Sequence, residues 1–127
     1  MRWEYWKTAI NIIKNNPLIG VGTGDVQDEF NKQFNNNKSL LDQKYRLRSH
    51  NQLLSYSVSF GLIGLIMFVF CLFYPLISTK IYKNYIYSVF FCIVVLSMFS
   101  EDTLEVQAGI NFFAFFNTLF LLSLQKK

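Results

Sequence analysis

The stretch Arg46-Leu47-Arg48-Ser49-His50-Asn51 is followed at once by the apolar run that decides the fold, residues 53–77. No charged side chain occurs between residues 51 and 79, and the run consists almost entirely of Leu, Ile, Val, Phe, Tyr and Met. About 20 apolar residues are enough to cross the hydrocarbon core of a bilayer. The run therefore predicts a membrane-spanning helix with length to spare for tilt. The only histidine of the chain, His50, stands where this helix begins.

The composition is also that of a membrane protein. The chain has 127 residues, of which 52% are hydrophobic and 18% aromatic, and the apolar residues are gathered into runs. The net charge is +4, but the basic residues form no patch with interleaved aromatics, which argues against binding of nucleic acid. Anionic membrane lipids are better partners for this charge.

Three apolar runs predict three transmembrane helices, at about residues 53–77, 83–100 and 106–124. The expected fold is all-α, an integral membrane helical bundle. An extracytoplasmic, partly helical loop (residues 1–50) precedes the membrane domain (residues 51–127). Gly61 and Gly64, together with Ser57, offer a small-residue face for close helix contact. Pro75 is expected to kink or stop the first span.

The short connections predict the orientation of the spans. Lys80 and Lys83 flank the first connection, and such residues favour the cytoplasm. The first connection and the C-terminus are then cytoplasmic, whereas the second connection and residues 1–50 lie outside. The second connection carries only acids, which either pair with Arg46 and Arg48 or cap the third helix, and capping is the preferred role. These acids are Glu101, Asp102 and Glu105.

The first fifty residues contain two predicted helices with a glycine-rich segment between them. Residues 2–15 form an amphipathic helix that lies either in the lipid headgroup zone or in an ordinary packed position, and both alternatives stay open. Asp25 is expected to cap a helix from residue 26 to 35 that carries Val26, Phe30 and Phe34 on one face. The apolar face of the first helix is predicted to hold Trp3, Trp6, Ala9, Ile10 and Ile13.

The glycines of residues 17–25 are typical of a turn, although alternating glycines such as Gly22 and Gly24 also let backbone amides approach a phosphate. No metal site is expected, because the chain has one histidine and its two cysteines, Cys71 and Cys92, lie inside apolar runs.

His50 and the two arginines before it are the candidate chemical groups. Imidazole titrates near neutrality and can take a proton from a hydroxyl. The guanidinium groups of Arg46 and Arg48 match phosphate oxygens. From the residues alone, a structural role for His50 and a membrane-anchoring role for the two arginines are the preferred interpretations, and the chemical roles are the alternative.

Four motifs, in this order, resemble the O-antigen ligase and polymerase superfamily. They match the C-terminal part of those proteins, which comprises the large periplasmic loop and the last membrane helices. The motifs are Arg2 with Trp6 and Ala9, then Pro-Leu-Ile-Gly-Val-Gly-Thr-Gly at 17–24, His-Asn-Gln-Leu-Leu at 50–54 and Phe-Gly-Leu-Ile-Gly-Leu at 60–65.

The resemblance implies transfer of a glycan from an undecaprenyl-diphosphate carrier to an acceptor hydroxyl, on the periplasmic side of the bacterial inner membrane. The acceptor is lipid A–core in ligases and another repeat unit in polymerases of lipopolysaccharide synthesis. Such glycosyltransferases need no metal or cofactor. By this resemblance, His50 is the catalytic base and Arg2 grips the diphosphate. Arg46 or Arg48 assists in substrate binding, as do Gly22 and Gly24.

Proteins of this superfamily have many membrane helices before the periplasmic loop. The chain is therefore expected to be a C-terminal fragment of a larger enzyme, or the product of a split or decayed gene, and to be inactive alone. The alternative is a small non-catalytic membrane protein or inactive remnant that acts, if at all, as a helical partner of a larger membrane protein. The motifs do not separate ligase from polymerase and do not identify the sugar.

Overall fold

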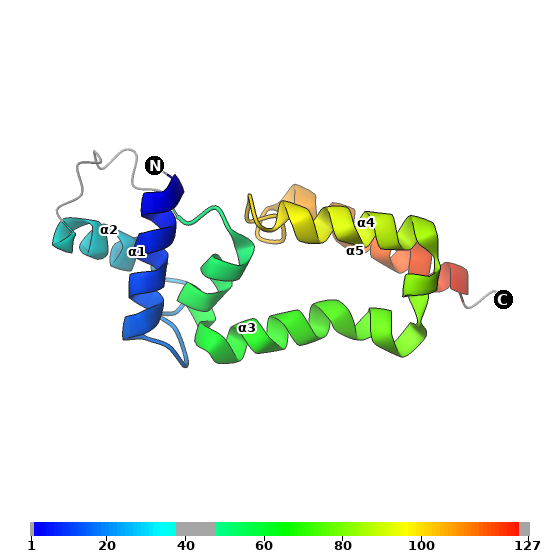
Figure 1. Ribbon diagram of the computed structural model, residues 1–127, viewed down its shortest axis with the longest axis horizontal. Helices are drawn as coiled ribbons and strands as arrows, with labels where there is room; N and C mark the ends of the chain where they lie inside the picture. Colours follow the sequence, from blue (N-terminus) through cyan, green and yellow to red (C-terminus); the bar gives the residue numbers. More distant parts are fainter. Residues whose placement is uncertain (1, 38–47, 125–127) are drawn as a thin grey trace.

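Residues 2–37 and 48–124 are described by a computed structural model, in which every regular element of the described part is a helix (Figure 1). The predicted all-helical class is confirmed for these residues. In chain order the elements are α1 (Arg2–Asn15), α2 (Val26–Asn36), α3 (Gln52–Thr79), the short 3-10 helix η2 (Ile81–Lys83), α4 (Tyr85–Ser97) and α5 (Gln107–Leu124).

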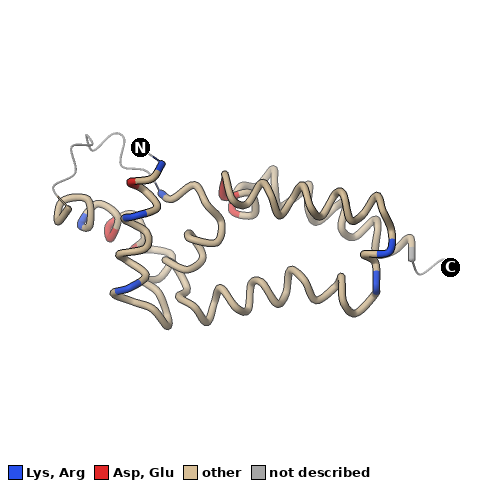
Figure 2. Tube along the Cα trace, in the orientation of Figure 1, with Lys and Arg blue, Asp and Glu red and all other residues tan. Residues whose placement is uncertain are grey.

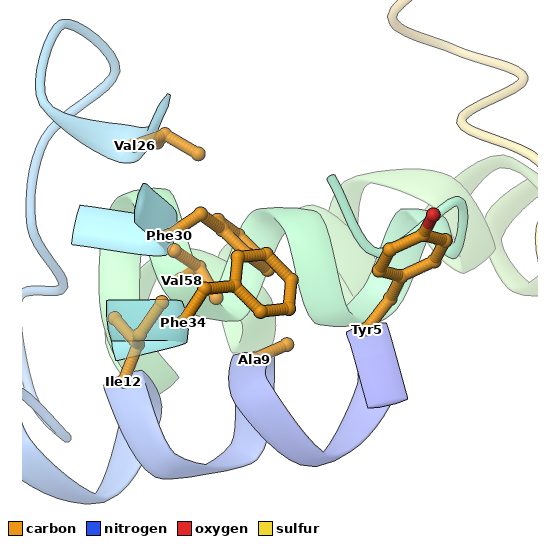
Figure 3. Close-up of a cluster of buried hydrophobic side chains, with 7 residues drawn as sticks. All are labelled: Tyr5, Ala9, Ile12, Val26, Phe30, Phe34 and Val58. Carbon is orange, nitrogen blue, oxygen red and sulfur yellow. The ribbon is translucent and has the colours of Figure 1, made fainter. Parts of the chain in front are cut away.

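α1 and α2 pack against the first part of α3 around a cluster of buried side chains (Figure 3). Phe30 and Phe34 of α2 are almost completely buried, and Val58 of α3 is also buried in the cluster. The small side chain of Ala9 on α1 lies beside Phe34 (Figure 3). The predicted helix at 26–35 and its apolar face, which includes Val26, are thus confirmed.

α1 buries a different face from the predicted one. Tyr5, Ala9 and Ile12 are buried at i, i+4 and i+7 spacing, whereas Trp3 and Ile10 are 74% and 43% exposed. The helix carries two apolar stripes that share Ala9, and the periodicity does not say which one packs. The buried stripe has a small residue at its centre, which lets α2 and α3 approach closely.

The prediction that the Asp25 side chain caps α2 is wrong, although Asp25 does precede the helix. Asp25 occupies the N-cap position, but its side chain makes no capping hydrogen bond. Its backbone is helical, with φ of −96° and ψ of −3°. Capping side chains normally extend from a residue in the β region, from which they reach the first free amides of the helix.

α3 is interrupted at Gly61, where the helix changes direction (Figure 1). Gly61 has φ of 66° and ψ of −166°, outside the helical region. In a continuous helix, the amides of residues 62 and 63 would donate to the carbonyls of residues 58 and 59. The interruption leaves these four backbone groups without their helical partners.

Residues 17–22 pair with all four of these groups. Val21 and Gly22 donate their amides to the carbonyls of Val58 and Ser59, both at 2.9 Å. In the opposite direction, the amides of Leu62 and Ile63 donate to the carbonyls of Pro17 and Leu18, at 2.9 and 3.3 Å. Since an unpaired buried backbone group costs about 1–3 kcal/mol, the interruption is stable only with residues 17–22 in place.

Two glycines make this approach possible. A Cβ on Gly61 would lie 2.3 Å from the carbonyl carbon and oxygen of Leu18, and a Cβ on Gly20 would lie 2.6 Å from the amide nitrogen of Gly61. Both glycines also have positive φ. Ser57 is buried as well. Of the predicted small-residue face, Gly61 therefore receives the backbone of residues 17–22, in place of the neighbouring helix that the sequence predicted.

α3 is the one helix of the described part that is long and apolar enough to cross a membrane. α4 has 13 residues, about 20 Å at 1.5 Å per residue, against a hydrocarbon core of about 30 Å. α5 is also classed with the shorter apolar helices. The structure thus supports one spanning helix and does not confirm the predicted three-span bundle.

The second half of the molecule packs around a separate apolar cluster. Its buried members come from α3, η2, α4 and the turn after α4, and partly buried side chains of α5 lie against them. The buried members are Leu72, Ile81, Tyr87, Phe91, Val94 and Met98.

The expectation that Pro75 would stop α3 is wrong, whereas the expected kink stays a prediction. Pro75 lies inside the helix, which continues to Thr79 and ends before Lys80, a residue with left-handed backbone geometry. The hydroxyl of Thr79 donates to the carbonyl of Pro75 at 2.6 Å, which pairs a carbonyl in the last turn of the helix.

The charged residues lie at opposite ends of the apolar helices (Figure 2). The start of α3 and the α4–α5 connection are at one end, and the α3–α4 connection with Lys80 and Lys83 is at the other (Figures 1 and 2). The acidic connection and residues 48–50 therefore share one end, as the sequence predicted.

We expect Gly61→Ala to lower the stability of the fold by about 1–3 kcal/mol, because Ala must adopt a strained positive φ and displace the Leu18 backbone. Thermal unfolding in detergent micelles, followed by circular dichroism, measures the change. Gly24→Ala is the matched control, since a Cβ there meets nothing within 4 Å. Equal midpoints for the two variants would contradict the pairing of residues 17–22 with the α3 interruption.

Candidate functional site

The start of α3 is tied to the α4–α5 connection by polar side chains. Asn51 caps α3 by accepting a hydrogen bond from the amide of Leu54, and its own amide group donates to the carbonyl of Phe99 at 3.1 Å. The side-chain oxygen of Gln52 accepts from the amide of Leu104 at 2.7 Å. Ser55 donates to the Asp102 carboxylate at 2.7 Å.

These ties gather six charged or titratable side chains from three distant parts of the chain, and we call this group the polar corner. It comprises Arg2, Arg48, His50, Glu101, Asp102 and Glu105.

His50 stands at the junction between the segment before α3 and the helix itself. Its backbone is left-handed, with φ of 47°, while the next residue is extended, so the chain turns sharply into α3. The imidazole is 39% exposed, and its Nδ1 lies 3.4 Å from Oε2 of Glu101. The ring of Tyr5 on α1 lies 6.3 Å from the imidazole ring, centroid to centroid. One edge of the imidazole therefore faces a carboxylate, while the side chain remains accessible to solvent.

Arg2 reaches the same carboxylate from the first turn of α1. Its guanidinium donates to the carbonyl of Ser100, and it lies 4.0 Å from Oε1 of Glu101. Glu101 is thus shared between Arg2 and His50, two residues separated by most of the first fifty positions. The segment before α3 is held on α1 as well, since Trp6 donates its indole N–H to the carbonyl of Ser49 at 3.1 Å.

Arg48 pairs with the other end of the acidic connection. Its guanidinium lies 3.8 Å from Oε2 of Glu105, and Nε2 of Gln52 lies 3.5 Å from Oε1 of the same carboxylate. Burial raises the pKa of Glu105 above its usual range, and the nearby Asp102 raises it further, whereas Arg48 opposes the shift.

A cavity of about 340 Å³ opens beside this ion pair. Its wall brings together the glycine-rich segment, the start of α3 and the acidic connection. The lining residues are Thr23, Arg48, Tyr56, Ser59, Phe60 and Glu105. It combines a guanidinium, a carboxylate, two aliphatic hydroxyls, a phenol and a phenyl ring, a surface suited to a ligand with polar and apolar parts.

The structure brings Arg2, Arg48 and His50 together, whereas Arg46 lies outside the described residues. Gly22 is exposed, but its amide already donates to the carbonyl of Ser59 and is not free for a phosphate. A Cβ on Gly24 would meet nothing within 4 Å, so its backbone is open to solvent. The predicted substrate contacts of Gly22 and Gly24 stay predictions.

The preferred role of the acids, capping the helix now identified as α5, is wrong. The first turn of α5 contains no acidic residue, because the helix begins only at Gln107. Glu105 instead pairs with Arg48, which is the alternative that the sequence left open, whereas Glu101 pairs with Arg2 and His50.

Sequence analysis overlooked the polar side chains at the start of α3, namely Asn51, Gln52 and Ser55. All three are buried, and all three bond to the α4–α5 connection. A signal was present, because buried polar residues at the head of an apolar run require specific partners. Among the described residues, no group of three or more His, Cys, Asp and Glu side chains could hold a metal ion.

The described residues combine helices alone, one of them long and apolar enough to cross a membrane, with a cluster of Arg, His and Glu at the head of that helix. This combination is typical of integral membrane proteins with a polar surface site. The family model described as O-antigen ligase (Wzy_C) matches residues 1–69, more than half of the 127 residues. The chain is therefore a member of the O-antigen ligase family, which confirms the resemblance seen in the motifs. Neither a curated protein nor a solved structure matches it.

Family membership supports a role in polysaccharide biosynthesis and a place in the bacterial inner membrane, where members of this family are integral. The matched region covers α1, α2 and the α3 interruption. It also contains three residues of the polar corner, Arg2, Arg48 and His50. The acidic connection with Glu101 lies beyond the match.

We expect Glu105→Gln to raise the unfolding midpoint at pH 7. The raised pKa means that the folded state holds a proton more tightly than the unfolded state does. Stability from this group is therefore lost as pH rises from the ordinary carboxyl range through the raised pKa, and regained as pH falls. Unfolding midpoints measured between about pH 4.5 and pH 7 should depend less steeply on pH in the variant than in the parent. An unchanged slope would contradict the assignment, and Glu29→Gln on α2 is the control.

Proposed function

We propose that the chain supplies the acceptor-activating part of a membrane glycosyltransferase of the O-antigen ligase or polymerase type. The donor is a glycan on undecaprenyl diphosphate, and the acceptor is a hydroxyl of lipid A–core or of another glycan. One observation carries the proposal: His50 and Arg2 meet at the same carboxylate, Glu101, in a chain of this family.

His50 acts as the general base. A neutral imidazole that directs its Nδ1 proton to Glu101 leaves Nε2 free to accept a proton. The acceptor hydroxyl gives its proton to Nε2 as its oxygen attacks the anomeric carbon of the donor. The bond between this carbon and the diphosphate oxygen breaks, and the lipid diphosphate leaves. Glu101 is a positioning residue here, because it fixes the tautomer and orientation of the base.

Arg2 and Arg48 meet the charge of the diphosphate. Each guanidinium pairs with a single carboxylate on the acidic connection, at 4.0 and 3.8 Å, and both remain partly exposed. A diphosphate carries more charge than one carboxylate and accepts bidentate hydrogen bonds, so it can replace these contacts. Thr23 lines the cavity beside Arg48. The neighbouring Gly24 is therefore the better candidate of the two predicted glycines for a substrate contact.

The proposed topology has residues 1–50 on the periplasmic side and residues 51–127 in the membrane, with three spans and a cytoplasmic C-terminus. The separation of charge supports it, because Lys80 and Lys83 lie at the end opposite the acids (Figure 2). α4 and α5 would cross together with the turns that flank them. Further membrane helices of a larger enzyme, as the resemblance implies, would cover the exposed apolar side chains of α3, such as Ile66 and Phe70.

We expect His50→Ala to abolish glycan transfer, since general-base catalysis contributes about 10²–10⁴-fold to a rate. Transfer is measured in membranes that carry the variant at its own locus, as the yield of glycan on the acceptor. Lys32→Ala, on the far side of α2, is the control for expression and insertion. Retained transfer with normal insertion would contradict the role of His50 and favour the non-catalytic alternative.

We expect Glu101→Gln to lower kcat by about 10-fold or more while the KM for the acceptor changes little, because a positioning residue acts through the base. Steady-state transfer in membrane vesicles separates the two constants. A rise in KM with an unchanged kcat would mean that Glu101 binds substrate and does not orient His50. Glu29→Gln, on α2 and away from the polar corner, is the matched control.

A further inference from the structure

The cavity beside Arg48 continues into an apolar groove on α3. The groove has a volume of about 310 Å³ and shares Tyr56 and Phe60 with the cavity. Beyond these two rings it is lined by Gly64, Met67, Phe68 and Cys71. We propose that cavity and groove form one site for a lipid that carries a phosphate on a single long chain. The headgroup binds at Arg48, and the chain lies along α3 as far as Cys71.

The interruption of α3 joins the cavity to the groove. Tyr56 and Phe68 are twelve residues apart in the sequence, which is about 18 Å along a continuous helix. In the structure their rings stack with centroids 4.2 Å apart, because α3 changes direction at Gly61 and Tyr56 lies back against residues 62–79. The ring of Tyr56 also lies 5.5 Å from that of Phe60, centroid to centroid. Three aromatic rings therefore lead from the polar cavity to the apolar groove.

The groove follows a single row of residues on the longer part of α3. Gly64, Phe68 and Cys71 succeed one another at intervals of four and three residues, the spacing of neighbours on one helix face. Gly64 keeps the row shallow, since a Cβ there would overlap the Cβ of Phe60. Phe68 also packs against the apolar cluster of α3, α4 and α5, so the groove runs along the edge of that cluster. Such a row suits one hydrocarbon chain, whereas a phospholipid has two.

The head of the site has the groups that bind a phosphate. The side chain of Arg48 is 45% exposed and lies 3.8 Å from the carboxylate of Glu105. Phosphate oxygens accept paired hydrogen bonds from a guanidinium. The hydroxyls of Thr23 and Ser59 line the same cavity and can donate further bonds. A neighbouring membrane helix in the groove would leave these polar groups unused, so a lipid with an anionic headgroup matches both ends of the site.

The site is directed along the helix that can cross the membrane. Arg48 pairs with the acidic connection, which lies at the end of the apolar helices opposite Lys80 and Lys83 (Figure 2). From Phe60 to Cys71 the groove extends for eleven residues, about 16 Å at 1.5 Å per residue. The inference rests on the proposed function only for the identity of the lipid, which is the polyprenyl diphosphate donor.

Native mass spectrometry of the full chain, released from detergent micelles, measures the bound lipid. The probes are undecaprenyl phosphate and geranyl phosphate, which has the same headgroup on a chain too short to reach Cys71. We expect Cys71→Trp to weaken binding of undecaprenyl phosphate by about tenfold, because the indole occupies the path of the chain. Binding of geranyl phosphate should not change, whereas Arg48→Ala should weaken binding of both lipids. Cys92→Trp, at an exposed position of α4 outside the groove, is the matched control.

A second measurement needs no substitution. Farnesyl phosphate with a diazirine at the end of its chain has about the length of the groove, and we expect it to crosslink to residues 67–71 on illumination. An excess of undecaprenyl phosphate should suppress the crosslink. If Cys71→Trp lowers the unfolding midpoint, this crosslink alone decides. A crosslink confined to other residues would overturn the proposal.

Two further results would also overturn it. One is equal binding of undecaprenyl phosphate to a folded Cys71→Trp variant and to the parent. The other is equal competition by phosphatidylglycerol, because the site would then accept any anionic phospholipid. Failure of the groove is distinguishable from failure of the proposed function. Lost transfer in His50→Ala with normal binding in Cys71→Trp would refute the groove alone, and retained transfer with weakened binding would refute the catalytic role alone.

Discussion

Four backbone hydrogen bonds between residues 17–22 and the interruption of α3 hold the outer helices on the membrane helix. They set the direction of α1, which enters residues 17–22 from its C-terminal end. They also allow residues 52–60 to turn away from the long part of α3 and meet the α4–α5 connection (Figure 1). The first apolar cluster forms in the angle so produced, with Val58 as its contribution from α3. The position of His50 follows from this geometry, because it directly precedes the segment that turns.

The polar corner keeps most of its charged side chains accessible, although burial disfavours the charge of Glu105. The side chains of Gln52 and Ser55 are buried, yet each has a partner on the acidic connection. The side chains of Arg2, Arg48 and Glu101 stay at the rim, where solvent reduces the cost of a charge near lipid. Glu101 lies between the guanidinium of Arg2 and the imidazole of His50 and leaves both side chains accessible. A site for a large, charged lipid-linked ligand requires both features: buried hydrogen bonds that hold the chain in place, and charged side chains that remain accessible to the ligand.

Much of the fold was accessible from the sequence, because length and periodicity are local properties. The spanning helix at 53–77 and the face of α2 followed from them directly. The interruption at Gly61 did not, since a glycine in an apolar run fits close helix packing equally well and its true partner lies about forty residues earlier. The motifs pointed to Arg2 and His50 for the site, but not to Glu101, whose contact with them exists only in the folded chain.

The pairing at Gly61 also couples two events that would otherwise be independent. If residues 17–22 detached, the freed groups of α3 could be satisfied in the bilayer only by one another, as in an uninterrupted helix. α3 would then become a straight rod of 28 residues, about 42 Å long, which exceeds the hydrocarbon thickness of about 30 Å. Detachment of the outer helices and lengthening of the membrane helix are therefore a single transition. The pairing of residues 17–22 with the interruption at Gly61 therefore determines how much of α3 is available to span the membrane.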